Sequence, residues 1–235
     1  MRRAVCQTVL LSILLFGCPR RDSESGVTRT PAWVRDADRA WEERGDSFEE
    51  AEDLLHQAYA DNQRQTDVLW RLVRLQVAKG LAAEEKRQSQ YAFAEGRSLG
   101  LQCLDLDPAF QQRRVELGWP NALEVVQPER VHCLTWTTLA WVKWVQAHGA
   151  EAAALDIATL DELINAANLV ATDEDRGLLA WAAGILAAVR TDGQGDLTVA
   201  RSLLELALVA DPAAANIRAD LIFLVAVPNE DLELL

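Results

Sequence analysis

The stretch that decides the fold is "GDLTVARSLLELALVADP", residues 195–212, which has the pattern of one helix between two stop signals. Small and large residues recur in it at fixed spacing: Gly195, Ala200, Leu204, Ala207 and Pro212. Small residues on one face let a neighbouring helix approach closely, and the large residue between them fills the gap. The residue before a proline disfavours the helical region, so the helix ends at the Asp-Pro pair. The stretch therefore predicts one helix of a tightly packed hairpin.

This spacing resembles the second half of a tetratricopeptide repeat, whose pattern is Gly…Ala…large apolar…Ala…Pro. Two further segments follow it in degenerate form, "GDSFEEAEDLLHQAYADN" (45–62) and "GRSLGLQCLDLDP" (96–108). Weaker matches to the first helix of such a repeat are "WTTLA" (136–140) and "WAAG" (181–184). The alternative is an irregular helical bundle with coincidental alanines. Agreement among three units favours the repeat.

Helical spacing of apolar residues continues along most of the chain. The ranges that we predict to be helical are 32–44, 47–61, 67–79, 82–106, 129–147, 159–171, 174–190, 196–210 and 213–227. Ser47 and Glu50 form a capping-box pattern at the second helix, and Gly80 is read as a stop for the third. Residues 109–128 are read as a loop with one short helical turn. Short loops make neighbouring helices antiparallel, so we expect an all-α fold of stacked helical hairpins, a degenerate tetratricopeptide-like superhelix.

The charge of the chain excludes one class of partner. Its 235 residues carry a formal net charge of −13, and half of them are apolar. Binding to nucleic acid needs clustered Lys and Arg to neutralise phosphates, so we expect no nucleic-acid partner. The apolar fraction is enough for a substantial core.

The first residues have the order of a bacterial export signal. "MRR" is a basic start, "VLLSILLF" is an apolar run too short for an ordinary membrane span, and "LFGC" ends at Cys18. This order resembles a lipobox, in which the Cys becomes the lipid-bearing N-terminus after cleavage. The alternative is an ordinary secretory signal with an accidental Cys. We expect a signal peptide at 1–17, a lipidated Cys18 with a flexible tether at 18–31, and a helical domain at 32–235.

Two cysteines remain once the signal and the lipid have taken Cys6 and Cys18. They are Cys103 and Cys133, both in predicted helices. An oxidising compartment permits a disulfide. With only two cysteines left, these two would have to be its partners. The alternative is two buried thiols that act as small apolar residues. The sequence leaves both readings open.

The predicted helix 129–147 is apolar around nearly its whole circumference, apart from a polar stripe of His132, Thr135, Lys143 and Gln146. Such a helix is buried on several sides. It is read either as the centre of the stack or as the wall of an apolar cavity, and a tryptophan cluster at helical spacing favours packing. The candidate cavity-lining residues are Trp136, Trp141, Trp144 and Trp181.

Catalytic and cofactor motifs are absent from the sequence. The histidines, His56, His132 and His148, have no metal-binding spacing with one another or with Cys. No phosphate loop, dinucleotide fingerprint or nucleophile elbow occurs. We therefore expect no enzyme activity, no catalytic residues, no metal and no cofactor.

Three blocks in order resemble a known family: "CLTWTTLAWVKWVQAHG" (133–149), "LDIATLDELINAANLV" (155–170) and "GQGDLTVARSLLELALVADP" (193–212). Together with the lipobox and tether they resemble the TatT family, the tetratricopeptide lipoproteins associated with periplasmic TRAP-type transporters. The resemblance covers most of residues 35–227. It implies a non-enzymatic accessory protein that assembles as a homotrimer and pairs with a periplasmic substrate-binding protein. It also implies an apolar channel in each protomer for a small hydrophobic or amphipathic ligand.

These observations define the expected function and its alternatives. We expect a periplasmic scaffold anchored to a membrane only through its lipid, in the outer membrane rather than the inner one. Its expected partner is a periplasmic binding protein of a TRAP-type transport system. One alternative is a lipoprotein that holds a hydrophobic compound between tryptophan-lined helices. Another is a factor for envelope protein assembly or a general protein-interaction lipoprotein.

Overall fold

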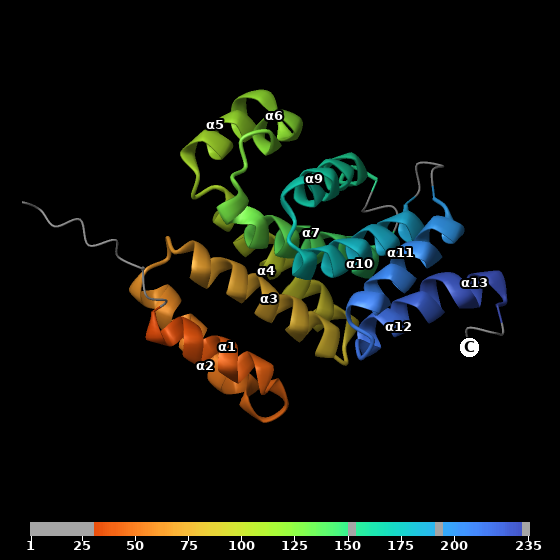
Figure 1. Cartoon of the computed structure of the whole chain (residues 1–235), viewed down its shortest axis with the longest axis horizontal. Helices are drawn as coiled ribbons and strands as arrows, with labels where there is room; N and C mark the ends of the chain where they lie inside the picture. Colours follow the sequence, from red (N-terminus) through yellow and green to blue (C-terminus); the bar gives the residue numbers. More distant parts are fainter. Residues whose placement is uncertain (1–30, 150–153, 191–194, 232–235) are drawn as a thin grey trace, which may run out of the picture. The chain divides into compact units, whose positions relative to one another are not determined.

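The computed structural model describes residues 31–149, 154–190 and 195–231, and within these ranges the chain forms helices and no strand (Figure 1). The all-α fold class expected from the sequence is confirmed. Residues 32–235 form one unit. The predicted signal peptide, Cys18 and nearly all of the tether lie outside the described residues. Within the described part of the chain, no helix is long and apolar enough to be a membrane span.

The helices follow one another with short connections. They are α1 (Ala32–Glu42), α2 (Arg44–Asp61), α3 (Thr66–Ala82), α4 (Lys86–Leu104), α5 (Pro108–Leu117), α6 (Trp119–Leu123), the 3-10 turn η1 (Pro128–Arg130), α7 (Val131–His148), α9 (Ile157–Val170), α10 (Asp173–Val189), α11 (Leu197–Ala210), α12 (Ala215–Leu221), the π-helical turn η2 (Ile222–Ala226) and α13 (Val227–Asn229).

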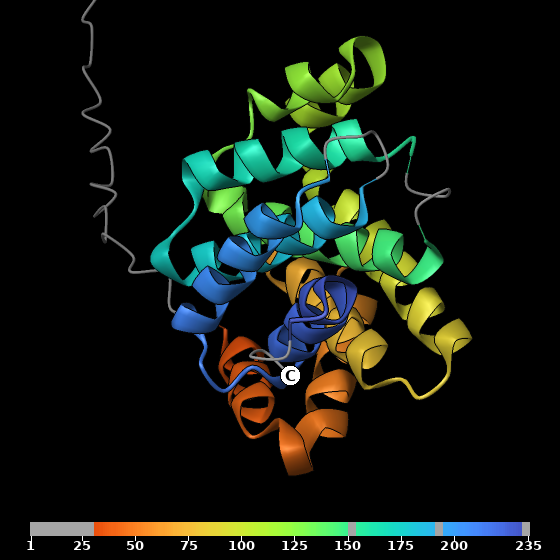
Figure 2. The ribbon, with the colours of Figure 1, turned by 90° about the vertical axis from the view of Figure 1, so that its right-hand side faces the viewer.

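Consecutive helices pack in pairs around α7. The most extensive contacts join α3 to α4 and α10 to α11, and α1 packs on α2. Helix α7 contacts both larger pairs as well as α9, so it is the centre of the core (Figure 1). The C-terminal segment, dark blue in Figure 2, packs through α12 and η2 against α10 and α11. The expected alternative in which the tryptophan-rich helix is central to the stack agrees with this arrangement.

The stretch 195–212 forms α11 and its two ends. The Asp196 carboxylate begins the helix by accepting hydrogen bonds from the backbone N–H groups of Thr198 and Val199, at 2.8 and 3.1 Å. Three of the spaced residues, Ala200, Leu204 and Ala207, are fully buried. Gly195 and Pro212 lie outside the helix bounds, before and after it. The residues of this spacing therefore form the face of α11 that is buried against the rest of the protein.

The partner of this face is α10, and Gly184 is the point of closest approach. A Cβ atom built on Gly184 would lie 2.8 Å from Leu204 Cγ and 3.2 Å from the carbonyl oxygen of Ala200. Real Cβ atoms essentially never come as close as 2.8 Å, so a larger residue at this position of the α10–α11 hairpin would require Leu204 to shift. The large residue of the pattern thus fills the space that the missing side chain leaves.

The segment 109–128 differs from its prediction as a loop, because it contains α5 and α6. The Asp107-Pro108 pair comes directly after the predicted helix 82–106. In the structure the Asp107 side chain also accepts hydrogen bonds from the N–H groups of Ala109 and Phe110, and Pro108 occupies the first turn of α5. Proline is well suited to that turn, where its missing N–H has no helical partner in any case.

Three predicted helix boundaries are also wrong. Helix α2 begins at Arg44, three residues before the predicted start. Helix α3 runs through the expected stop at Gly80 and ends at Ala82. Gly80 is instead buried against the Phe93 ring, where a Cβ atom would lie 2.4 Å from the ring. The last helix does not stop before Pro228. It widens into the η2 turn and continues as α13, whose first turn holds the proline that lacks an N–H.

A disulfide joins α4 to α7. Cys103 and Cys133 are bonded, with their Cα atoms 5.8 Å apart, and both residues are fully buried. Of the two readings left open by the sequence, the structure has the disulfide. One turn away, a Cβ atom on Gly100 would lie 2.2 Å from Thr137 Oγ1, so the two helices are in close contact there.

The hairpin contact predicts the effect of Gly184→Ala. Alanine is the better helix former by about 1 kcal/mol, but overpacking against Leu204 costs more, so we expect a net loss of about 1 to 2 kcal/mol in unfolding free energy. The measurement is urea denaturation followed by circular dichroism. In a Leu204→Ala background the same substitution should cost less, because the obstructing side chain is gone and only the tight approach to the Ala200 carbonyl oxygen remains. Equal effects in both backgrounds would contradict the contact.

The disulfide predicts a loss of stability on reduction. It closes a loop of 30 residues. We expect the Cys103→Ala/Cys133→Ala variant to unfold with a free energy lower by about 3 to 4 kcal/mol, because the cross-link restricts the unfolded chain. Denaturation of the unchanged protein with and without dithiothreitol provides the matched measurement. A midpoint that dithiothreitol leaves in place would show that the bond contributes no stability.

Candidate functional site

The four tryptophans predicted to line an apolar cavity lie in different surroundings. Trp141 and Trp181 are buried, whereas Trp136 and Trp144 are partly buried and pack against the core. No tryptophan lines the pocket between α3, α4 and α7 or the shallow pocket beside α11. The tryptophan-lined cavity therefore stays a prediction.

A buried ion pair joins α7 to α12. Lys143 Nζ lies 2.6 Å from Asp220 Oδ2, and the two side chains are only 4% and 9% exposed. The Trp181 indole N–H of α10 donates to the same oxygen at 2.6 Å, and the Gln146 amide donates to Oδ1 at 2.8 Å. Both carboxylate oxygens are thus bound, and three helices meet at one carboxylate.

The Lys143 ammonium is held from several sides. It donates to Gln146 Oε1 at 3.0 Å as well as to Asp220, and it lies 4.6 Å from the centroid of the Trp181 ring. Burial lowers the pKa of Lys143 below its ordinary value, and the attraction of the Asp220 carboxylate opposes that shift. A buried pair of this kind is costly to break, because either partner alone would be an uncompensated charge.

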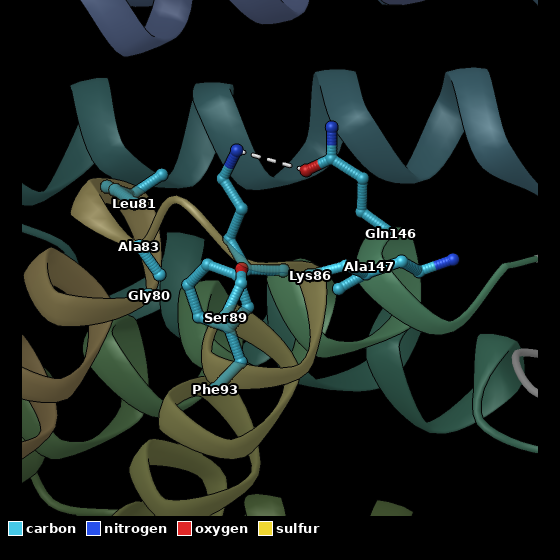
Figure 3. Close-up of a pocket in the computed structure, with 9 residues that line it drawn as sticks. Gly80, Leu81, Ala83, Lys86, Ser89, Phe93, Gln146 and Ala147 are labelled. Atoms are coloured by element: carbon cyan, nitrogen blue, oxygen red, sulfur yellow. Dashed lines mark hydrogen bonds between the residues drawn. The ribbon is translucent and has the colours of Figure 1, made fainter.

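A pocket of about 400 Å³ opens beside this ion pair. Its lining residues are Gly80, Leu81, Ala83, Lys86, Ser89, Phe93, Lys143, Gln146 and Ala147. Figure 3 shows Leu81 and Ala83 on one side, Gln146 and Ala147 on the other, and Ser89 above Phe93 at the base of the view. The dashed line in that figure is the hydrogen bond from Lys143 to Gln146. The end of α3, the start of α4 and the end of α7 therefore build one site.

The lysines of the chain are concentrated at this pocket. The sequence contains three lysines, Lys79, Lys86 and Lys143, against twenty arginines. Two of the three line the pocket, whereas Lys79 pairs with Glu52 at 2.6 Å and is not part of its wall. No Asp or Glu is among the lining residues. The wall thus contains two lysines and no carboxylate, although Asp220 balances the charge of Lys143.

A second polar cluster surrounds His132 at the start of α7. His132 Nδ1 lies 3.3 Å from Asp175 Oδ1, and the imidazole ring stacks on Trp70 with centroids 4.9 Å apart. The hydrogen bond to Asp175 raises the pKa of His132 above its ordinary value, against the effect of burial. Burial acts to raise the pKa of Asp175, but hydrogen bonds from His132 and Thr172 outweigh it and lower that pKa. The cluster is a charged pair at mildly acidic pH.

This cluster continues through Trp70 into a buried arginine. Arg71 forms a two-point ion pair with Asp38, with distances of 2.9 and 2.6 Å, and this pair joins α3 to α1. The Arg71 guanidinium lies 4.0 Å from the centroid of the Trp70 ring. We assign these contacts to the packing of α1, α3 and α7, because each charged group has its partner within the fold.

Arg97 lies between aromatic rings on another side of α7. Its guanidinium is 3.9 Å from the centroid of Trp141 and 4.9 Å from that of Trp144. Asp156 accepts the Trp141 indole N–H at 2.9 Å and pairs with Arg97 at 3.3 Å. Two of the tryptophans expected at a cavity wall are therefore covered by a cation from α4.

The outer side of α11 exposes an apolar row, which we call the α11 face: Val199, Leu206 and Val209. Their spacing places them on one side of the helix, and they are 47%, 57% and 76% exposed. A shallow pocket of about 480 Å³ adjoins the end of this row, lined by Glu205, Leu208, Val209, Pro212 and Arg218. Contiguous exposed apolar residues are typical of surfaces that bind another molecule.

The sequence indicated some of these residues and missed others. Lys143 and Gln146 belong to the predicted polar stripe of α7, but Asp220, their partner 77 and 74 residues away, was not singled out. The one available signal was an aspartate among apolar residues of the last helix. Among the described residues, no group of three or more His, Cys, Asp or Glu is placed to hold a metal ion.

Comparison with known proteins gives no family for this chain. No protein-family model matches it, and no curated protein matches its sequence. Fold and sites therefore define its class only as an all-α protein of packed helical hairpins, with a buried ion pair beside a lysine-lined pocket.

The His132 cluster predicts a pH dependence of stability. A raised folded pKa gives a contribution that is fully present below the ordinary value of 6.5 and is lost as the pH rises through the folded pKa. The pKa of Asp175 is lowered, so the stability that its carboxylate contributes is present above pH 3.8 and does not change between pH 6 and pH 9. We expect His132→Gln to destabilise the protein more at pH 6 than at pH 9, measured by urea denaturation. His148→Gln is the control, because His148 contacts the backbone carbonyl of Trp144 instead of a carboxylate. The same loss at both pH values would refute an ionised pair.

Proposed function

We propose that this protein is a lipid-anchored accessory protein of the bacterial envelope that binds a partner protein through its helical-hairpin surface. In its finer form, the proposal names the partner as the periplasmic substrate-binding protein of a TRAP-type transport system. The α11 face is the observation that carries the proposal, because an exposed apolar row lies on the hairpin that best follows the repeat pattern.

The repeat geometry supports a binding role over a chemical one. Stacked helical hairpins present extended surfaces, and proteins built from them use these surfaces for recognition. Exposed large apolar side chains are also unevenly distributed here. Of the ten in the described residues, five lie between 199 and 227: Val199, Leu206, Val209, Phe223 and Val227. The C-terminal part is therefore the favoured contact region.

The location and the identity of the partner are supported by the sequence. The basic start, the apolar run and "LFGC" before Cys18 support export and lipidation. The three blocks that resemble the TatT family support a TRAP-type partner and a trimeric assembly. A small hydrophobic ligand is a further property that this resemblance supports.

The experiment is direct binding between the full chain and the substrate-binding protein of a TRAP-type transporter from the same genome. We expect a complex by analytical ultracentrifugation in mild detergent, and we expect Leu206→Gln/Val209→Gln to weaken it by about tenfold or more, since central apolar contacts dominate such interfaces. Val115→Gln/Leu117→Gln is the matched control, because these residues are 73% and 58% exposed on α5, away from the α11 face.

Two outcomes would contradict the proposal. One is the absence of a complex at protein concentrations of about 100 µM, which would exclude a dissociation constant in the micromolar range. The other is an equal effect of the α5 and α11 variants. Anchoring has its own readout: Cys18→Ser should move the protein from the membrane fraction to the soluble fraction, and unchanged membrane association would refute lipidation at Cys18.

A further inference from the structure

We infer that the pocket between α3, α4 and α7 is a binding site for a small organic carboxylate, whose charged group contacts Lys143 and Lys86 and whose apolar body lies against Phe93. This site is separate from the α11 face and does not depend on the partner protein proposed above.

The charges of the wall favour an anion. Lys86 and Lys143 both line the pocket, and no acidic residue does. The chain carries a formal net charge of −13, and Asp220 already balances Lys143, so the net positive charge of the lining residues comes from Lys86. A carboxylate that enters the pocket therefore meets Lys86 and an N–H donor of Lys143, with no acidic residue among the lining residues to repel it.

The geometry of Lys143 leaves a donor for a ligand. An ammonium group has three N–H bonds. Asp220 Oδ2 and Gln146 Oε1 accept two of them, at 2.6 and 3.0 Å. No third acceptor for Lys143 occurs among the hydrogen bonds of the described residues, and its side chain lines the pocket. The ammonium is thus fixed in position before any ligand arrives, which lowers the entropic cost of binding.

Burial of Lys143 adds to the attraction. Its side chain is 4% exposed, so little water competes for its remaining N–H, and a charged hydrogen bond formed there is stronger than one at the surface. A ligand carboxylate would give Lys143 a second anionic partner. The Ser89 hydroxyl is a further donor of the same wall, and the exposed Lys86 ammonium lies on the first turn of α4.

The remaining wall is apolar and has a defined size. Phe93, Leu81 and Ala147 contribute side-chain carbon, and Phe93 packs so closely on Gly80 that a Cβ there would lie 2.4 Å from its ring. A volume of about 400 Å³ is at the small end of the range for ligand pockets. These features fit a carboxylate with a short aliphatic or aromatic body.

The test compares hexanoate with hexanamide, which has the same shape and no charge. The protein is the full chain with Cys18→Ser, and the method is isothermal titration calorimetry at pH 7 and low salt. We expect one site for hexanoate and binding at least about tenfold weaker for hexanamide, because a hydrogen bond to a charged group is lost. Added salt should weaken hexanoate but not hexanamide.

Three variants assign the binding to this pocket. Lys86→Gln should weaken hexanoate several-fold, whereas Lys79→Gln, the same change at the lysine outside the pocket, should leave it unchanged. Ala83→Trp should abolish binding by filling the space. The paired variant Lys143→Gln/Asp220→Asn replaces the ion pair by neutral groups and should remove the preference for hexanoate over hexanamide even where Lys143→Gln alone does not fold.

Clear results would overturn the inference. Equal affinity for hexanoate and hexanamide would show a merely apolar pocket, and no heat of binding with 10 mM hexanoate would show no site of the proposed kind. An equal effect of Lys79→Gln and Lys86→Gln would place the anion elsewhere. None of these outcomes bears on the complex with a partner protein, whose loss would in turn leave hexanoate binding intact.

Discussion

The fold depends on one buried carboxylate, Asp220, because it fixes the C-terminal segment to the helix at the centre of the core. Its oxygens accept from Lys143 and Gln146 of α7 and from Trp181 of α10. Apolar packing alone tolerates small sliding of one helix on another, whereas four polar groups of fixed geometry allow one register. The position of α12 follows from that register. The wall of the lysine-lined pocket follows as well, since the same contacts hold Lys143 in place.

Local spacing was enough to predict most of the helices and the packed face of α11. The pattern of 195–212 predicted that Ala200, Leu204 and Ala207 share one packed face, and all three are buried. The errors occurred where one residue type has two meanings. An Asp-Pro pair can follow a helix or begin one, and here Asp107-Pro108 begins α5 after α4 has ended at Leu104. Gly80 is a site of close contact with Phe93 instead of a stop. A single sequence does not distinguish these meanings, since the neighbour that decides between them is distant along the chain.

The candidate sites were harder to predict for the same reason. Lys143 belonged to a recognised polar stripe, but the stripe faces other helices and its anionic partner is 77 residues away. The pocket combines the end of α3 with parts of α4 and α7, and neither helix pattern nor motif marks such a junction. The scarcity of lysine in the chain was visible in the sequence. Its significance appears only when two of the three lysines are found on one wall.

The cross-link between α4 and α7 has a consequence for the life history of the chain. In reducing surroundings Cys103 and Cys133 would be thiols, and the two helices would be held by packing alone. Many exported chains pass through a narrow translocation channel before they fold, and premature folding would obstruct that passage. A chain with an export signal of the kind expected at residues 1–17 would thus be least resistant to unfolding before transport. It would reach its full resistance to unfolding only in the oxidising compartment, where the disulfide can form. Formation of this bond would thus link the stability of the fold to completed transport.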